Sequence, residues 1–263
     1  MIQPLAYVDP QAKIADNVVI EPFVTIHKNV EIGEGTWIGS NVTIFEGARI
    51  GKNCKIFPGA VISAAPQDLK YKGEDSTLHI GDNTIIRECV TLNKGTALDK
   101  NKTIIGSNCL IMAYVHVGHD CVIGDNVIIA NSVQLAGHIE VQDFVYIAGT
   151  SAVHQFVKIG AHAMVAGGSL VRKDVPPYTK AGREPLSYEG VNSIGLRRRG
   201  YTTEKIAEIQ EIYRILYLRG HNNAKAMGII EKEMAPTKER DEILSFIRES
   251  DRGVMKGYIS RRD

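Results

Sequence analysis

Residues 14–62 read IADNVV-IEPFVT-IHKNVE-IGEGTW-IGSNVT-IFEGAR-IGKNCK-IFPGAV-I, with an isoleucine at every sixth position. The same phase starts at Ile2 and, after a polar interruption, resumes at Ile80. A second run, shifted by one residue, carries an aliphatic residue at every sixth position from Ile105 to Val171. A six-residue period fits neither the 3.6-residue turn of a helix nor the two-residue alternation of a long strand. It is typical of hexapeptide repeats, in which short strands and turns stack as a parallel β-helix.

The repeats therefore predict a left-handed parallel β-helix, the hand being the one known for hexapeptide prisms. Three hexapeptides make one triangular coil, so we expect about nine or ten coils and a prism on the order of 45 Å tall. Cys54, Cys109 and Cys121 fall four residues after a repeat aliphatic, where small inward side chains belong, which predicts structural cysteines. Glycine often follows the repeat aliphatic, as at Gly33 and Gly51. We expect a tight bend with positive φ at these glycines.

The repeat also predicts the domain organisation. We expect a β-helix over residues 1–185, with loop insertions near 63–79 and 93–104, and a C-terminal α-helical domain over residues 186–263. A solenoid tolerates such insertions and tends to use them on a binding face. After the Pro-rich linker at 174–178, helical periodicity starts at Thr202. The first expected helix has Thr202 or Thr203 as its N-cap and ends at Gly220, and two more run over 223–234 and over 237–250.

Composition and charge narrow the class of protein. With 31 basic and 30 acidic residues, the chain has no excess charge to attract nucleic acid or a membrane surface. No stretch approaches eighteen consecutive apolar residues, so we expect no membrane insertion. The start MIQPLAYVDP lacks the basic and apolar regions of a secretory signal, and the four cysteines lack C-x-x-C spacing. Together these features predict a reduced, soluble, cytoplasmic protein.

A histidine cluster carries the candidate chemistry. His119 and His138 lie one coil plus one residue apart, so we expect them to be neighbours on successive coils. Neither they nor His116 occupies a repeat aliphatic position. Asp120 could fix the tautomer of His119 and raise its basicity, as a general base requires. Converging histidines and an aspartate also allow a metal site, and a scatter of surface histidines is the third interpretation. The chain has no P-loop, dinucleotide fingerprint or recognisable nucleophile motif.

Several segments occur together in a distinctive order: Gln67-Asp68-Leu69-Lys70-Tyr71, His116-x-x-His119-Asp120, Leu135-Ala136-Gly137-His138, Ala152-Val153-His154-Gln155-Phe156, Asp174-Val175-Pro176-Pro177-Tyr178, and Gly190-Val191-Asn192 leading to Gly195-Leu196-x-Arg198-Arg199-Gly200. In these segments the chain resembles the acyl-ACP:UDP-N-acetylglucosamine O-acyltransferases, which start lipid A synthesis in Gram-negative bacteria. The likeness covers the repeats, both insertions and the tail. The related N-acyltransferases carry an extra domain before their repeats, whereas here the repeat starts at Ile2.

The resemblance implies a mechanism and a set of site residues. His119 would take the proton from the glucosamine 3-hydroxyl of UDP-N-acetylglucosamine as that oxygen attacks the thioester of an (R)-3-hydroxyacyl-acyl carrier protein. Asp120 would orient His119, and the backbone N–H of Gly137 would stabilise the oxyanion. No cofactor and no metal are implied, because a thioester is already activated. The implied substrate-binding residues are Asp68, Lys70, His116, His138, His154, Gln155, Asn192, Arg198 and Arg199.

The resemblance further implies a homotrimer with active sites between prisms, and an acyl-chain ruler at Gly167. In one place the chain departs from the family, because an acidic residue is common where Ile194 stands. Two other classes remain open at this level. A γ-class carbonic anhydrase is also a hexapeptide trimer, but its nearby histidines are separated by four residues, whereas two separate His116 from His119. A non-catalytic solenoid would leave His119-Asp120 and the polar insertions unexplained.

Overall fold

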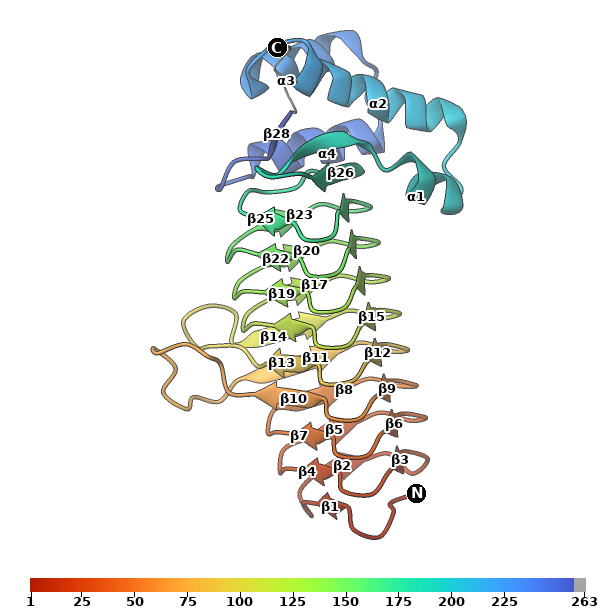
Figure 1. Cartoon of the computed structure of the whole chain (residues 1–263), viewed down its shortest axis with the longest axis vertical. Coiled ribbons are helices and arrows are strands. Elements are labelled where there is room, and N and C mark those ends of the chain that lie inside the picture. Colours follow the sequence, from red (N-terminus) through yellow and green to blue (C-terminus); the bar gives the residue numbers. More distant parts are fainter. Residues whose placement is uncertain (258–263) are drawn as a thin grey trace.

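The computed structural model describes residues 1–257 and shows a three-sided prism of parallel strands capped by helices (Figure 1). The nine strands of the first sheet are β1 (Tyr7–Val8), β4 (Thr25–Ile26), β7 (Thr43–Ile44), β10 (Val61–Ala64), β13 (Thr91–Asn93), β16 (His116–Val117), β19 (Gln134–Leu135), β22 (Ala152–Val153) and β25 (Leu170–Val171). The eight strands of the second are β2 (Lys13–Ile14), β5 (Glu31–Ile32), β8 (Ala48–Ile50), β11 (Thr77–Ile80), β14 (Lys102–Ile105), β17 (Val122–Ile123), β20 (Glu140–Val141) and β23 (Lys158–Ile159). Successive strands of one sheet are one coil apart.

The third sheet continues beyond the repeats. Its strands are β3 (Val19–Ile20), β6 (Trp37–Ile38), β9 (Lys55–Ile56), β12 (Ile85–Ile86), β15 (Leu110–Ile111), β18 (Ile128–Ile129), β21 (Tyr146–Ile147), β24 (Met164–Val165), β26 (Thr179–Gly182), β27 (Ser187–Val191) and β28 (Lys256–Gly257). β26 still pairs parallel with β24, but β27 turns back antiparallel to β26, which the sequence did not predict.

The aliphatic ladder forms the core, as the period predicts. The second residue of a typical two-residue strand points inward and is buried, as at Ile38 and Ile129. Cys54, Cys109 and Cys121 are buried as predicted. Burial raises the pKa of the Cys109 thiol to about 11 and that of Cys121 to about 12, so both stay protonated.

The expectation of positive φ at the glycines after the repeat aliphatics is wrong. Positive φ falls two residues later in the turn, at positions that include Asn29, Asn41, Asn53, Asn83, Asn108, Asp120, Asn126, His138 and His162. Gly33 is needed for a different reason: a Cβ there would lie 2.8 Å from the backbone carbonyl carbon and oxygen of Gly51. Glycine thus allows the backbones of successive coils to approach closely.

Two loops leave the prism on the same side (Figure 1). They comprise residues 65–76, between β10 and β11, and residues 94–101, between β13 and β14. Both are shorter than predicted, because Thr77–Ile80 and Lys102–Ile105 lengthen into paired strands at the base of the loops.

In the described part of the chain, four helices cap the C-terminal end of the prism: α1 (Ser193–Arg198), α2 (Thr203–Leu218), α3 (Asn223–Glu233) and α4 (Lys238–Arg248). Thr202 is the N-cap of α2, as predicted, with its side chain accepting from the N–H of Lys205. Tyr213 anchors α2 to the prism, its hydroxyl donating to Pro177 O over 2.5 Å. A domain division after residue 185 stays a prediction.

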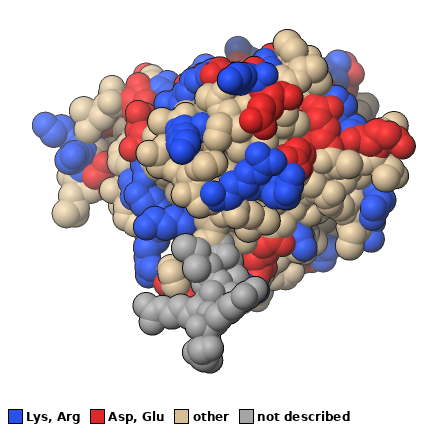
Figure 2. Space-filling view, turned by 90° about the horizontal axis from the view of Figure 1, so that it is seen from above, with Lys and Arg blue, Asp and Glu red and all other residues tan. Residues whose placement is uncertain are grey.

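Seen from the C-terminal end of the prism, basic and acidic side chains are interspersed on the surface (Figure 2). Among the helices of residues 1–257, none is both long and apolar enough to span a bilayer.

Candidate active site

His119 and Asp120 lie at the turn that follows β16. Asp120 is fully buried in the positive-φ position of this turn, and its Oδ2 lies 2.8 Å from His119 Nδ1. Thr96, from the loop 94–101, donates its N–H to both carboxylate oxygens (3.0 and 3.1 Å) and its hydroxyl to Oδ2 (2.7 Å). A carboxylate surrounded by donors favours the tautomer of His119 with a proton on Nδ1. Nε2 is then the acceptor nitrogen.

Gly137, one coil further on, lies against the imidazole of His119. A Cβ at Gly137 would come within 2.8 Å of both Cε1 and Nε2 of His119, so only glycine leaves room for the ring. The Gly137 N–H forms no hydrogen bond with any group of residues 1–257. The acceptor nitrogen of His119 and an unpaired backbone donor therefore lie on adjacent coils.

His138 is the neighbour of His119, as the spacing predicts. The two rings meet edge to face with their centroids 4.9 Å apart. Phe156 stacks on His138 at 4.5 Å with an interplanar angle of 13°, and Asp99 Oδ2 lies 2.6 Å from its Nδ1.

His116 is half-buried in β16 and shares a 2.8 Å hydrogen bond between its Nδ1 and Thr91 Oγ1. Burial, followed by the charge of His119, lowers the pKa of His116. His116 is therefore neutral at physiological pH.

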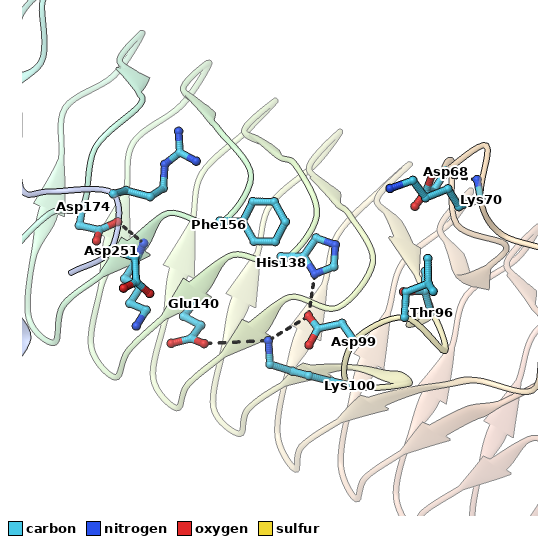
Figure 3. Close-up of a pocket in the computed structure, with 13 residues that line it drawn as sticks. Asp68, Lys70, Thr96, Asp99, Lys100, His138, Glu140, Phe156, Asp174 and Asp251 are labelled. Atoms are coloured by element: carbon cyan, nitrogen blue, oxygen red, sulfur yellow. Dashed lines mark hydrogen bonds and ion pairs between the residues drawn. The ribbon is translucent and has the colours of Figure 1, made fainter. Parts of the chain in front are cut away.

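A cavity of about 660 Å³ opens beside these residues (Figure 3). It brings Asp68 and Lys70 of the loop 65–76 to the same space as His138, and Asp68 Oδ1 accepts from the N–H of Lys70 over 3.0 Å. His119 is not on its wall and adjoins it through His138. The lining residues are Asp68, Lys70, Thr96, Leu98, Asp99, Lys100, His138, Glu140, Phe156, Lys158, Asp174, Asp251 and Arg252.

A second cavity, of about 690 Å³, lies between α1 and the outer face of the third sheet, with Asn192, Ile194, Arg198 and Arg199 on its wall. Asn192 is the N-cap of α1: its Oδ1 accepts from Gly195 N over 3.3 Å. Arg198 and Ile194 are exposed, and the Ile194 side chain has no polar atom to offer a ligand.

The wall of the second cavity is supported by an aromatic stack. The His162 ring lies between Phe144 and Tyr178, with centroids 4.9 and 5.4 Å away, and its carbonyl accepts from Asn192 Nδ2 over 2.9 Å. The Arg199 guanidinium lies over the Phe144 ring and donates to Phe144 O over 2.9 Å. Burial, then the charge of Arg199, lowers the pKa of His162 to about 4. Sequence reasoning missed this stack.

His154 and Gln155 are exposed and form no hydrogen bond with the other predicted site residues; His154 Nδ1 lies 3.1 Å from Gln155 O. Gly167 is also exposed, and it is Gly168 that takes the positive φ of the turn. A Cβ at Gly167 would lie 3.3 Å from Gly149 O and 3.8 Å from Ala148 Cβ, so a side chain there needs a shift of a few tenths of an ångström at the Gly149 carbonyl.

A metal site is the alternative to a general base. Ligand atoms of His119, Asp120 and His138 lie within 4.8 Å of one another. However, Asp120 already accepts from Thr96 and His119, and His138 Nδ1 is paired with Asp99. These hydrogen bonds favour two oriented imidazoles over a shared cation.

Comparison with known proteins gives a consistent result. A family model described as "Udp N-acetylglucosamine O-acyltransferase; Domain 2" matches residues 174–255, and one described as "Bacterial transferase hexapeptide (six repeats)" matches 102–137. The acyl-[acyl-carrier-protein]–UDP-N-acetylglucosamine O-acyltransferase of Thiobacillus denitrificans is 43% identical over 97% of this chain and 99% of its own length. The enzyme of that name from a Sulfurihydrogenibium species is 51% identical over 99% of this chain and 96% of its own. This chain belongs to the acyl-[acyl-carrier-protein]–UDP-N-acetylglucosamine O-acyltransferase family.

Solved structures of this O-acyltransferase family agree. The UDP-N-acetylglucosamine acyltransferase from Bacteroides fragilis superposes with a TM-score of 0.96 at 50% identity, covering 97% of this chain and 100% of that one. The Arabidopsis enzyme superposes with a TM-score of 0.85 at 34% identity, covering 97% and 100%. The fold is thus the left-handed parallel β-helix with C-terminal helices that the repeat predicted. Family membership decides against a carbonic anhydrase or a non-catalytic solenoid.

Proposed function

We infer that this chain transfers an (R)-3-hydroxyacyl group from acyl carrier protein to the glucosamine 3-hydroxyl of UDP-N-acetylglucosamine, the first step of lipid A biosynthesis. One observation carries the chemistry: His119, oriented by the buried Asp120, has its Nε2 next to Gly137, whose N–H is unpaired among residues 1–257. The substrates are inferred from the family, because its members are named for acyl-acyl carrier protein as the donor and UDP-N-acetylglucosamine as the acceptor.

The reaction needs only these groups. His119 Nε2 takes the proton of the 3-hydroxyl while the oxygen attacks the thioester carbonyl carbon. The Gly137 N–H donates a hydrogen bond to the carbonyl oxygen and stabilises the negative charge that develops on it. The carbon–sulfur bond then breaks, and the imidazolium returns its proton to the departing thiolate. Asp120 stays ionised throughout and stabilises the imidazolium, so no covalent enzyme intermediate is required.

Substrate binding is divided between the two cavities. Asp68, Lys70 and His138 line the first cavity, where they would hold the sugar and hydroxyacyl groups. His116 is not on the wall of this cavity and would line the acceptor site next to it. Arg198 has no partner among residues 1–257 and would take the diphosphate at the second cavity, with Arg199 nearby. The Asn192 amide already holds the start of α1, so its main contribution would be to shape this cavity.

We expect a homotrimer in the cytoplasm. A row of apolar side chains runs up the outer face of the third sheet in register, and a row of this kind is typical of a surface covered by another copy. Its members are Ile85, Leu110, Ile128, Tyr146 and Met164. Sites between prisms would also bring two substrate-binding residues that the single chain leaves apart from His119 to the bound substrates: His154, and Gln155, which would contact the acceptor.

The test is direct. Purified protein is incubated with UDP-N-acetylglucosamine and 3-hydroxyacyl carrier proteins of several chain lengths, and the sugar nucleotide is analysed by mass spectrometry. We expect one acyl group on the 3-oxygen. An unmodified sugar nucleotide with every charged carrier would overturn the assignment. Sedimentation equilibrium of the same sample tests the trimer separately, because it needs no turnover.

A further inference from the structure

A second carboxylate–histidine pair lies next to the first, with its histidine in the corresponding turn of the next coil. Asp99, in the loop 94–101, lies 2.6 Å from His138 Nδ1. Both side chains are largely shielded, with 31% of Asp99 and 15% of His138 exposed. His119-Asp120 therefore has a close neighbour of the same chemistry, built from a different part of the chain.

Asp99 is itself held in place. Lys100 Nζ lies 3.3 Å from Asp99 Oδ2 and 3.9 Å from Glu140 Oε1, which ties the loop to β20 of the prism (Figure 3). Burial acts to raise the pKa of Asp99, but the hydrogen bond with His138 and the charge of Lys100 together lower it. Asp99 is an acceptor at neutral pH, so the bond places the proton on His138 Nδ1.

The contacts of the His138 ring divide into two kinds. Phe156 stacks on its face and His119 meets it edge to face, and these contacts fix the plane of the ring. Neither contact distinguishes the ring from one rotated by 180° about its Cβ–Cγ bond. Only Asp99 does so, because only Nδ1–H can donate to it. His138 Nε2 has no partner among residues 1–257, and it is turned toward the opening below Asp68 (Figure 3).

We propose that Asp99 is a positioning residue that locks His138 in one orientation and tautomer, so that His138 Nε2 accepts a hydrogen bond from a substrate hydroxyl. The proposal rests on the acyl transfer proposed above. Two hydroxyls have suitable chemistry, one on the 3-hydroxyacyl chain and one on the sugar. In this proposal the pair acts through the orientation of the ring, so its loss should weaken the use of substrate without unfolding the prism.

The experiment compares full-length Asp99→Ala and Asp99→Asn with Asp75→Asn. Asp75 is the matched control: it is an exposed carboxylate of the other insertion loop and has no hydrogen bond or ion pair within residues 1–257. We expect Asp99→Ala to lower kcat/KM about tenfold or more, because a misplacement of about 1 Å in a site can cost up to about 10²-fold in rate. Asp99→Asn should lose less, because its amide oxygen still accepts from Nδ1–H. The control should stay within twofold of wild type.

A spectroscopic measurement separates positioning from folding. In protein labelled with ¹⁵N-histidine, the His138 signals, assigned by their loss in His138→Gln, should report a proton on Nδ1 in wild type and a mixture of tautomers in Asp99→Ala. Unchanged kcat/KM in both Asp99 variants, or a loss without a tautomer change, would overturn the proposal. If the wild type transferred no acyl group, the proposed function would fail, and the tautomer measurement would still decide whether Asp99 controls His138.

A comparison of acyl carriers with and without the 3-hydroxyl on the acyl chain shows which substrate hydroxyl donates its hydrogen bond to His138 Nε2. If it is the acyl hydroxyl, Asp99→Ala should lose its penalty with an unsubstituted acyl carrier. If it is the sugar hydroxyl, the penalty should be the same for both carriers and should fall mainly on the KM for the sugar nucleotide.

Discussion

The regular coils and the insertion loop 94–101 contribute different things to the same site. The coils place His119, Gly137 and His138 against one another, because residues one coil apart stack in register. The loop supplies the partners that fix the tautomers of these histidines: Thr96 acts on His119 through Asp120, and Asp99 acts on His138 directly. The repeat therefore positions the side chains of the site, and the loop that interrupts the repeat provides the hydrogen-bond partners on which their chemistry depends.

The difference has a geometric origin. A side chain at the corner of a coil points away from the core, so its neighbours are the same corners of the coils above and below. Corner side chains on successive coils can stack their rings, as His138 and Phe156 do. They provide few groups that could form hydrogen bonds in the plane of such a ring. A loop that leaves the prism and folds back over the corner is needed to bury a carboxylate such as Asp120 with donors around it.

The largest expected effect comes from the coil. His119→Ala should lower kcat by roughly 10²–10⁴-fold, because it removes the group that takes the hydroxyl proton. The fold should persist, since His119 is not part of the aliphatic ladder. Steady-state turnover with the sugar nucleotide is the measurement, and His221→Ala in the helical tail is the control. Near-wild-type turnover in a folded His119→Ala protein would show that the proton goes elsewhere.

Gly137→Ala tests the contact between coils. The new Cβ would lie 2.8 Å from Cε1 and Nε2 of His119, so the ring must move. A displacement of about 1 Å from the reactive position can cost about 10²-fold in rate, and we expect a loss in kcat of that order. In Gly228→Ala, the control in α3, the added Cβ meets nothing within 4 Å, and helix propensity should add up to about 1 kcal/mol of stability. Equal activity of the two variants would contradict the packing of His119 on Gly137.

Thr96→Val tests the loop. Valine keeps the backbone N–H that Asp120 accepts but removes the hydroxyl donor at 2.7 Å. A hydrogen bond to a charged group contributes about 1.5–3 kcal/mol, so we expect a lower free energy of unfolding and about a tenfold loss of kcat/KM. Urea unfolding and initial rates measure the two effects. Thr96→Ser should restore both, and a Thr96→Val protein with unchanged kinetics would mean that the loop does not control Asp120.

Much of the fold could be predicted because one local rule repeats. The aliphatic at each sixth position, the inward cysteines and the Thr202 cap all follow from contacts within a coil or a helical turn. The reason for Gly33 could not be read locally, because it depends on the backbone of the next coil. The antiparallel β27 has no counterpart in the hexapeptide pattern, so it was missed.

The site divides in the same way. The nineteen-residue spacing predicted that His119 and His138 are neighbours, since it is set by the coil. Thr96 and Asp99 were missed because their contacts depend on the path of a loop that has no period. The sequence feature that could have pointed to them is the interruption of the repeat at the loop 94–101, shortly before His116. This loop folds onto the corner of the prism that carries His119 and His138. The roles of all the predicted site residues, among them His154, Gln155 and Gly167, stay predictions.

The smallest expected effect concerns Gly167, a position on a coil with no loop over it. Positive φ belongs to Gly168, so the turn does not require glycine at 167, and a Cβ there would make one tight contact, 3.3 Å from Gly149 O. In the proposed cleft between prisms the missing side chain leaves room for a long acyl chain, and each buried methylene contributes ~0.8 kcal/mol, or about fourfold in kcat/KM. We therefore expect a preference for long 3-hydroxyacyl chains. Gly167→Met should shift the preference toward shorter chains, because its side chain blocks the end of the groove. The measurement is kcat/KM over a series of chain lengths for both proteins. A uniform loss at all lengths would place the ruler elsewhere, since steric exclusion penalises only chains long enough to reach residue 167.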